Sequence, residues 1–254
     1  MKLLIDAGNS LVKWALVNGD DWLCQGVLPT LQADRLSLDI AERITRQNTG
    51  AGLQDIQQIW ASNVAGETCA GHIRNIGTAR TGQPNFIAAQ KFQCGVINGY
   101  TSASQLGSDR WAALIAAWHL VKGTCLVVNS GTATTIDALS AQGEFTGGLI
   151  VPGIELMQRS LVAATDQLQS ATGVYSAFPR NSADAIYSGA IQAVGGAIER
   201  QYALLGSGDA PVILSGGAAG LILPYLNQTH FGVPARVVDN LVLHGLRLIA
   251  LEAD

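Results

Sequence analysis

The sequence predicts an α/β fold made of two similarly built halves, and three observations support this prediction. An order of strand, glycine turn, strand, hairpin and helices begins at residue 1 and again at about residue 124. Hydrophobic residues make up 48% of the 254 residues and charged residues only 13%, which is typical of a compact globular protein large enough for two cores. The pattern restarts after Lys122-Gly123, so we predict domains over residues 1–122 and 123–254.

The first half begins with a meander of predicted strands. Residues 2–6 and 11–17 are apolar stretches on either side of a glycine turn. Asn18-Gly19-Asp20-Asp21 predicts a type I′ hairpin turn, because Asn and Gly accept positive φ angles, and residues 22–28 form the next strand. After it we expect a helix over 34–47, a strand over 56–62, a helix over 67–76, and a helix capped by Ser104 that runs to residue 121.

The second half repeats this order after Lys122-Gly123. Residues 124–129 form an apolar strand, Ser130-Gly131 a turn, and residues 132–139 and 143–149 continue the meander. The remaining expected elements are helices over 154–164 and 183–205, a strand over 211–214, and a final helix over about 241–251.

Composition and charge exclude several classes of function. The net charge of −4, without a basic run, offers no electrostatic footprint for nucleic acid. Cys24, Cys69, Cys94 and Cys125 form no CxxC pair, so neither a zinc site nor a disulfide framework is predicted. No apolar stretch approaches the ~20 residues that span a bilayer. We therefore expect a soluble, cytoplasmic protein with neither a nucleic-acid nor a membrane partner.

The first candidate site is the turn Asp6-Ala7-Gly8-Asn9-Ser10, followed by Lys13. Gly8 lets backbone N–H groups point outward as a small anion nest, while Ser10 and Lys13 add donors for phosphate. Asp6 offers a carboxylate that can hold Mg²⁺ directly or through water. An ordinary hairpin turn explains this short pattern about equally well.

A second turn with the same features opens the second half. Asn129-Ser130-Gly131-Thr132 follows an apolar strand and surrounds a glycine with hydroxyl groups, although a solvated strand face also explains it. Two such turns, one in each half, are more specific for a triphosphate than either alone. A third glycine-rich turn, over residues 215–220, has room for an adenine ring, but a plain strand-to-helix turn explains it nearly as well.

Gly107-Ser108-Asp109-Arg110 places two opposite charges at the start of a predicted helix. Asp109 can accept the proton of a substrate hydroxyl, and Arg110 can bind an anionic group. Spacing alone slightly favours a simpler interpretation, a helix-terminal acid that interacts with the helix dipole and a surface arginine.

Taken together, five segments resemble the type III pantothenate kinases in order and spacing over nearly the whole chain. They are Asp6-x-Gly8-Asn9-Ser10-x-x-Lys13, Asn98-x-Tyr100, Leu106-Gly107-x-Asp109-Arg110-Trp111, Gly131-Thr132-Ala133-x-Thr135-x-Asp137 and Gly147-Gly148-x-Ile150-x-Pro152-Gly153. The Bvg accessory factor group, named for a role in transcription, shares these motifs. The resemblance implies two ribonuclease-H-like domains of the acetate/sugar kinase–Hsp70–actin superfold and a homodimer. The implied reaction is ATP-dependent phosphorylation of the 4′-hydroxyl of pantothenate, the first step of coenzyme A biosynthesis.

The resemblance also implies roles for individual residues. Asp109 would be the catalytic base. Ser182 would reach the pantothenate bound by the neighbouring subunit of the dimer. The residues that would bind the ATP phosphates, with Mg²⁺ at Asp6, are Asp6, Gly8, Asn9, Ser10, Lys13, Gly131 and Thr132. Those that would line the pantothenate pocket are Tyr100, Gly107, Ser108, Asp109 and Arg110.

Three positions depart from the family pattern. Ser10 and Ser182 replace threonine but keep the hydroxyl group. Asn129 stands where the family usually has an aspartate that coordinates a monovalent cation, which puts a requirement for K⁺ or NH₄⁺ in question. The alternative hypothesis is therefore a nucleotide-binding regulator with weak or no kinase turnover, and a third is a kinase for another small hydroxylated acid.

Overall fold

The computed structural model describes residues 1–47, 52–77, 80–164, 172–228 and 234–254, and it confirms the predicted α/β class. The chain divides into two compact units. The first unit contains Met1–Ala116 together with Asn240–Asp254, and the second contains Ala117–Asp239. The C-terminal helix α7 (Leu241–Glu252) thus groups with the beginning of the chain. The domain boundaries expected from the sequence, 1–122 and 123–254, stay a prediction.

The first unit has a five-stranded sheet in the order β3-β2-β1-β4-β5. Alternation along β1 points Leu3 and Ile5 to one face and Leu4 to the other, and all three side chains are fully buried. Both faces of this sheet are therefore covered. β1 (Lys2–Ala7), β2 (Leu11–Asn18) and β3 (Asp21–Pro29) form an antiparallel meander, whereas β4 (Gln58–Asn63) is parallel to β1 and β5 (Asn85–Phe86) is parallel to β4.

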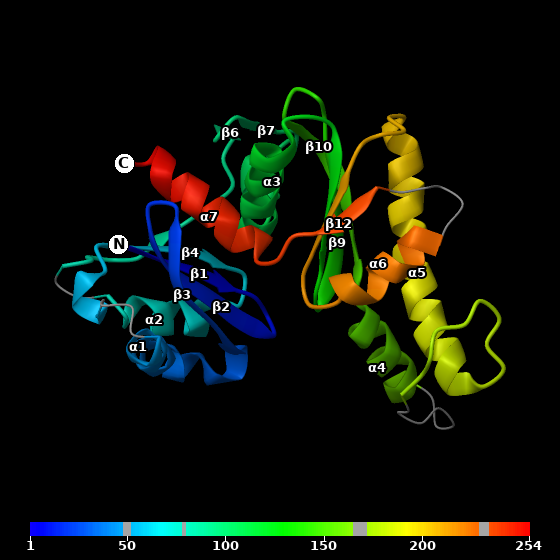
Figure 1. Cartoon of the computed structure of the whole chain (residues 1–254), viewed down its shortest axis with the longest axis horizontal. Coiled ribbons are helices and arrows are strands. Elements are labelled where there is room, and N and C mark those ends of the chain that lie inside the picture. The colour runs from blue at the N-terminus through cyan, green and yellow to red at the C-terminus, as the bar shows by residue number, and fades with distance from the viewer. Residues whose placement is uncertain (48–51, 78–79, 165–171, 229–233) are drawn as a thin grey trace. The chain divides into compact units, whose positions relative to one another are not determined.

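Helices cover the two faces of this sheet (Figure 1). α1 (Leu36–Arg46) and α2 (Glu67–Arg74) share a core with Leu3 and Ile5, while α7 packs on the opposite face. α3 (Ser108–Val121) approaches α7 closely at Gly245, where a Cβ atom would collide with the backbone of Ala112. The remaining segments of this unit are 3₁₀ turns at Thr30–Arg35, Leu53–Asp55 and Ala103–Gln105 and a hairpin of β6 (Phe92–Gln93) and β7 (Val96–Asn98).

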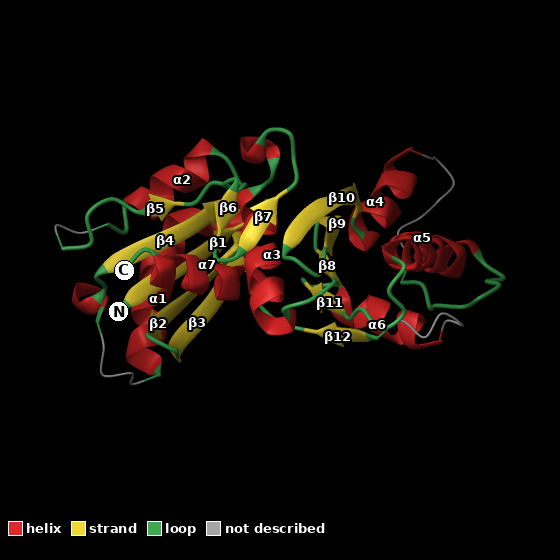
Figure 2. Ribbon diagram, turned by 90° about the horizontal axis from the view of Figure 1, so that it is seen from above, coloured by secondary structure: helices red, strands yellow, loops and turns green. Residues whose placement is uncertain are grey.

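The strands of the second unit repeat the arrangement of the first, in the order β12-β11-β8-β9-β10. An antiparallel meander is again followed by a strand parallel to its first member and a further strand parallel to that one. This confirms the repeated order seen in the sequence. The strands are β8 (Cys125–Ser130), β9 (Ala133–Leu139), β10 (Glu144–Pro152), β11 (Val212–Ser215) and β12 (Ala235–Val237). The helices that pack against them (Figure 2) are α4 (Ile154–Ala164), α5 (Ser182–Leu205) and α6 (Ala219–Gln228).

Local expectations failed at two turns. Ser104 does not cap the helix, because α3 begins at Ser108 and the Trp111 N–H donates to the Gly107 carbonyl at 3.0 Å. The hairpin between β2 and β3 is present, but only Gly19 in it has a positive φ, of 60°. A type I′ turn needs positive φ at both central residues, so that turn type was wrong.

Two findings concern the classes of function that composition excluded. In the part of the chain that the structure describes, no helix is both long and apolar enough to cross a membrane. Within the same residues, no three His, Cys, Asp or Glu side chains are grouped to hold a metal ion. Cys24, Cys69 and Cys125 are buried free thiols.

Candidate active site

The first unit places Asp6 at the carboxyl edge of its sheet. Asp6 pairs with Lys13 in the antiparallel strand β2 and with Ser62 in the parallel strand β4. The carboxyl ends of parallel strands lie at the same edge of a sheet. Open α/β sheets bind their ligands at that edge. The turn that follows β1, with exposed Asn9 and Ser10, continues from this edge. The carboxylate, the lysine and the turn selected from the sequence therefore lie together.

Hydrogen bonds hold this turn in one conformation. The Gly8 N–H donates to the Leu11 carbonyl at 3.0 Å. Thr30 adds two bonds from the end of β3, because its Oγ1 donates to the Gly8 carbonyl at 2.7 Å and its N–H donates to the Ser10 carbonyl at 2.9 Å. Thr30 thus stabilises the turn Asp6–Ser10, which we call the proposed phosphate turn.

Asp109 lies in the first turn of α3, and its carboxylate is folded back onto the helix end. Its Oδ1 accepts the Arg110 N–H at 2.8 Å. A Cβ atom at Gly107 would lie only 2.6 Å from the same oxygen, so this position of the carboxylate needs glycine there. The Ser108 and Ser62 hydroxyl oxygens are 2.9 Å apart, which joins the start of α3 to the end of β4.

Two carboxylates are close enough at this edge to affect each other. Burial and the charge of Asp109 raise the pKa of Asp6 to about 7, while Lys13 acts in the opposite direction. A bound divalent cation would relieve this repulsion. Mg²⁺ is commonly held by one or two carboxylates together with substrate phosphates, so Asp6 fits a magnesium ligand, directly or through water.

Arg110 is buried, with 6% of its surface exposed, so the surface arginine favoured by spacing alone was wrong. Its Nη1 donates to the Tyr100 hydroxyl at 3.2 Å, and its guanidinium carbon lies 5.8 Å from the centre of that ring. The buried Asn98 shapes the loop that presents Tyr100, accepting the Tyr100 N–H at 3.0 Å and donating to the Ala103 carbonyl at 3.3 Å. Asn98-x-Tyr100 is therefore a structural turn that positions an aromatic ring beside a cation.

In the second unit, the turn between β8 and β9 packs against two glycine turns. The Gly153 N–H donates to the Thr132 carbonyl at 2.9 Å, and the Ala218 N–H donates to the Ser130 carbonyl at 3.1 Å. Gly131 and Thr132 themselves are exposed. The glycine-rich turn over residues 215–220 is thereby brought next to the hydroxyl-rich turn, which the sequence did not indicate.

Asn129 immediately precedes this turn. A Cβ atom at Gly216, whose φ is 92°, would lie 2.7 Å from Asn129 Oδ1 and would also collide with the Ser130 carbonyl oxygen. Glycine at this position thus lets the backbone approach two neutral oxygen atoms closely. Neither oxygen carries the charge that a carboxylate would offer to a monovalent cation.

Ser182, the last residue selected, is exposed at the first position of α5 in the second unit. Its neighbour Asn181 caps the helix, because the Asn181 side chain accepts the Asp184 N–H at 2.9 Å.

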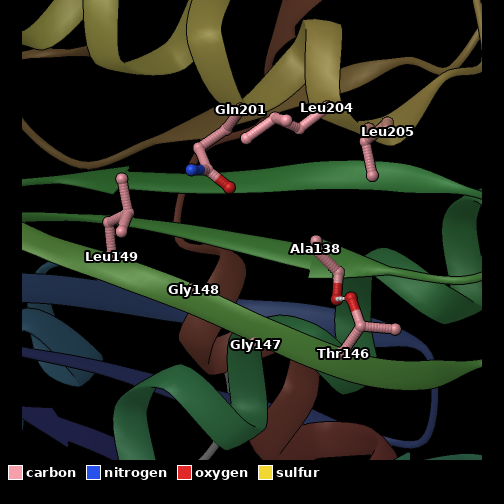
Figure 3. Close-up of a pocket in the computed structure, with 8 residues that line it drawn as sticks. All are labelled: Ala138, Thr146, Gly147, Gly148, Leu149, Gln201, Leu204 and Leu205. Atoms are coloured by element: carbon pink, nitrogen blue, oxygen red, sulfur yellow. Dashed lines mark hydrogen bonds between the residues drawn. The ribbon is translucent and has the colours of Figure 1, made fainter.

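A separate cavity of about 330 Å³ lies between α5 and the strands β9 and β10 (Figure 3). Ala138, one of the residues that line this cavity, lies at the end of β9 that is away from the Gly131–Thr132 turn. None of the side chains that line it is charged, so it does not suit a triphosphate. They are Ala138, Thr146, Gly147, Gly148, Leu149, Gln201, Leu204 and Leu205.

Comparison with known sequences agrees with the motifs. A family model described as type III pantothenate kinase matches residues 2–204. A type III pantothenate kinase from Nitrosospira multiformis is 47% identical to this chain over 99% of its length and 92% of the relative's. One from Aromatoleum aromaticum is 44% identical over 99% and 98%. The chain belongs to the type III pantothenate kinase family. It is a phosphotransferase that phosphorylates pantothenate in coenzyme A biosynthesis, as the resemblance implied.

Solved structures show that this pantothenate kinase has the fold that the resemblance implied. A Baf family protein from Campylobacter jejuni matches with a TM-score of 0.60 at 23% identity, covering 99% of this chain and 98% of its own. The ethanolamine utilization protein EutJ from Carboxydothermus hydrogenoformans matches with a TM-score of 0.59 at 14% identity, covering 98% and 89%. At these identities the likeness concerns the fold alone, which is that of the acetate/sugar kinase–Hsp70–actin superfold.

Sequence reasoning about this kinase missed Thr30 and Ser62. No local pattern marks Thr30, because its bonds to Gly8 and Ser10 depend on how the β2–β3 hairpin folds back. Ser62 had a usable signal, since a polar residue at the carboxyl end of an apolar strand often faces a site in α/β proteins.

Proposed function

We propose that this kinase transfers the γ-phosphoryl group of ATP to the 4′-hydroxyl of pantothenate with Asp109 as the general base. The observation that carries this proposal is the Ser62–Ser108 contact at 2.9 Å, which joins the helix start that bears Asp109 to the sheet edge at Asp6, where the charge of Asp109 raises the pKa of Asp6. A base must lie within reach of the hydroxyl it deprotonates, and that hydroxyl must lie beside the phosphoryl group. One carboxylate near the proposed phosphate turn and a second at the adjacent helix start suit these two tasks.

We assign the ATP phosphates to Asp6, Gly8, Asn9, Ser10 and Lys13, and the family motif assigns Gly131 and Thr132 to them as well. The exposed turn after β1 supports this assignment, as does Lys13, which pairs with Asp6 across the ladder. Mg²⁺, when bound at Asp6, offsets the negative charge of the phosphates. A monovalent cation at Asn129 would add to this effect only weakly.

We assign pantothenate to the residues at the start of α3 and to Tyr100 beside them. The buried guanidinium of Arg110 supports this assignment, because it is an always-charged partner for a substrate carboxylate, and Tyr100 holds its orientation. Gly107 and Ser108 contribute the wall next to Asp109. Ser182 would complete the pocket from the neighbouring subunit of a homodimer, and the buried free thiols suit a cytoplasmic location.

The experiment is to incubate the purified protein with MgATP and pantothenate and to measure 4′-phosphopantothenate. Asp109→Asn should lower kcat by ~10²–10⁴ while ATP binding survives, because the base is lost but the phosphate turn is intact. Asp34→Asn, at an exposed position, is the matched control and should leave kcat unchanged. Near-normal turnover of Asp109→Asn would rule out this base.

A further inference from the structure

Ser62 is a polar residue in a fully buried position. Its exposure is 0%, as is that of its strand neighbours Ile59 and Ala61, whose side chains are apolar. A buried hydroxyl without a partner destabilises a protein, so serine at such a position needs a hydrogen bond. The hydroxyl of Ser108, 2.9 Å away, supplies it.

This bond joins α3, which carries Asp109, to β4, which pairs with the strand that carries Asp6. On one side, Ser62 is the register partner of Asp6 in the parallel ladder of β4 and β1. On the other, Ser108 is the first residue of α3 and directly precedes Asp109. The two carboxylates are thus linked through one strand pairing and one pair of hydroxyl groups.

The two sides of this link differ in rigidity. Asp6 is held by ladders to strands on both sides. Asp109 sits in the first turn of a helix, where the backbone has fewer hydrogen bonds than in the helix interior. Because Asp109 caps its own helix through the Arg110 N–H, its carboxylate must follow any movement of this turn.

We propose that Ser62 is a positioning residue of the kinase reaction, and that its hydrogen bond to Ser108 holds the Asp109 carboxylate at its distance from Asp6 and the bound phosphates. This inference rests on the proposed role of Asp109 as the base. Ser62 itself touches no reacting atom and acts through Ser108. A displacement of about 1 Å in such a group can cost up to ~10²-fold in rate.

The test is a double-mutant cycle on kcat and on both KM values with Ser62→Ala, Ser108→Ala and the double variant. Ser62→Ala should lower kcat about tenfold while KM for MgATP stays unchanged, because misplacement affects the chemical step rather than nucleotide binding. The double variant should be no slower than the slower single variant, because both remove the same hydrogen bond. Additive losses in kcat, or an unchanged kcat in Ser62→Ala, would overturn the proposal.

Two further variants separate positioning from stability. Ser62→Thr keeps the hydroxyl on a residue suited to strands and should restore most of kcat, whereas recovery no better than with alanine would count against the proposal. Ser140→Ala is the control, because it removes a hydroxyl that accepts the Gln142 and Glu144 N–H groups in the distant β9–β10 turn, and it should leave kcat unchanged. If Ser62→Thr does not fold, the double-mutant cycle with Ser108→Ala tests the proposal by itself.

The outcomes also distinguish this inference from the proposed function. If Asp109→Asn is inactive but Ser62 and Ser108 show no coupling in kcat, the role of Ser62 is refuted and Asp109 remains the base. If Asp109→Asn keeps normal turnover, the base is refuted, and the role proposed for Ser62 falls with it.

Discussion

Asp6 carries its carboxylate in surroundings that disfavour the charge, because burial and the neighbouring Asp109 raise its pKa to about 7. In the unfolded chain an aspartate has a pKa of ~3.9. A group with a raised pKa in the folded state stabilises the protein most below its unfolded pKa. That contribution is lost as the pH rises through the folded value. Without nucleotide or Mg²⁺, the stability due to Asp6 should therefore fall between about pH 4 and pH 7.

Asp6→Asn should remove this pH dependence, since asparagine stays neutral. We expect the melting temperature of the variant, relative to the unmodified protein, to rise between about pH 4 and pH 7 and to level off above pH 7 in metal-free buffer. Thermal unfolding followed by circular dichroism measures it, with Asp34→Asn as a control at an exposed aspartate. A difference that stays constant with pH would show that Asp6 does not titrate in this range.

Asn129 should make the response to K⁺ or NH₄⁺ weak. A unit charge at a few Å is worth a few kcal/mol at an effective dielectric of ~20, and Asn129 Oδ1 lacks that charge. We expect catalysis with a poorly saturable dependence on K⁺, and Asn129→Asp should sharpen it. Initial rates against K⁺ concentration at constant ionic strength provide the measurement. Tight activation that Asn129→Asp leaves unchanged would exclude this side chain as the determinant.

Among the elements, α3 and α7 make a contact that depends on a single glycine. A Cβ atom at Gly245 would collide with the Ala112 carbonyl and would lie 2.8 Å from the Ala112 Cα. The backbone atoms cannot move aside without separating the helices. This contact supports the helix whose first turn carries Asp109.

Gly245→Ala should therefore destabilise the protein, by about 1–3 kcal/mol or more, as overpacking typically does. Gly71→Ala is the matched control, because Gly71 is also inside a helix of the first unit but has nothing within 4 Å of an added Cβ. It should stabilise by about 0.5–1 kcal/mol, since alanine is the better helix former. Urea unfolding measures both changes, and an equal effect of the two substitutions would contradict this account.

Most long elements were predictable because their patterns are local. α4 matches the predicted helix over 154–164, and α5 begins one residue before the predicted start. The predicted helix over 34–47 was only partly right, because residues Thr30–Arg35 form a 3₁₀ segment and α1 starts at Leu36. Short strands such as β5 and β12 were missed, because two or three residues are too few to show a periodicity. Such strands form only by pairing with a neighbouring strand.

For the whole molecule, the quaternary structure remains a prediction. Ser182 is exposed at the start of α5, and the segment before it carries the apolar side chains Val174 and Phe178, which are 71% and 89% exposed. Large exposed apolar side chains next to a proposed site are typical of an interface. They support a homodimer in which Ser182 serves the neighbouring subunit.

Ser182→Ala should accordingly raise KM for pantothenate more than KM for ATP, because only the pantothenate pocket would lose a hydroxyl group. Sedimentation at micromolar concentration should show a dimer, and Ser140→Ala should change neither KM. An unmodified protein that is monomeric at this concentration and fully active would refute the shared pocket.

The sequence by itself determined the α/β class, the repeated order of strands, the family and the principal site motifs. Apolar alternation, glycine turns and motif spacing are local properties, so they can be read without coordinates. Only the tertiary structure decided that Arg110 is buried, that Gly107 makes room for the Asp109 carboxylate, and that Thr30 and Ser62 support the site. The Thr30–Gly8 and Ser62–Ser108 contacts join residues that are 22 and 46 positions apart in the sequence. Such pairs meet only because the strands and helices pack in three dimensions.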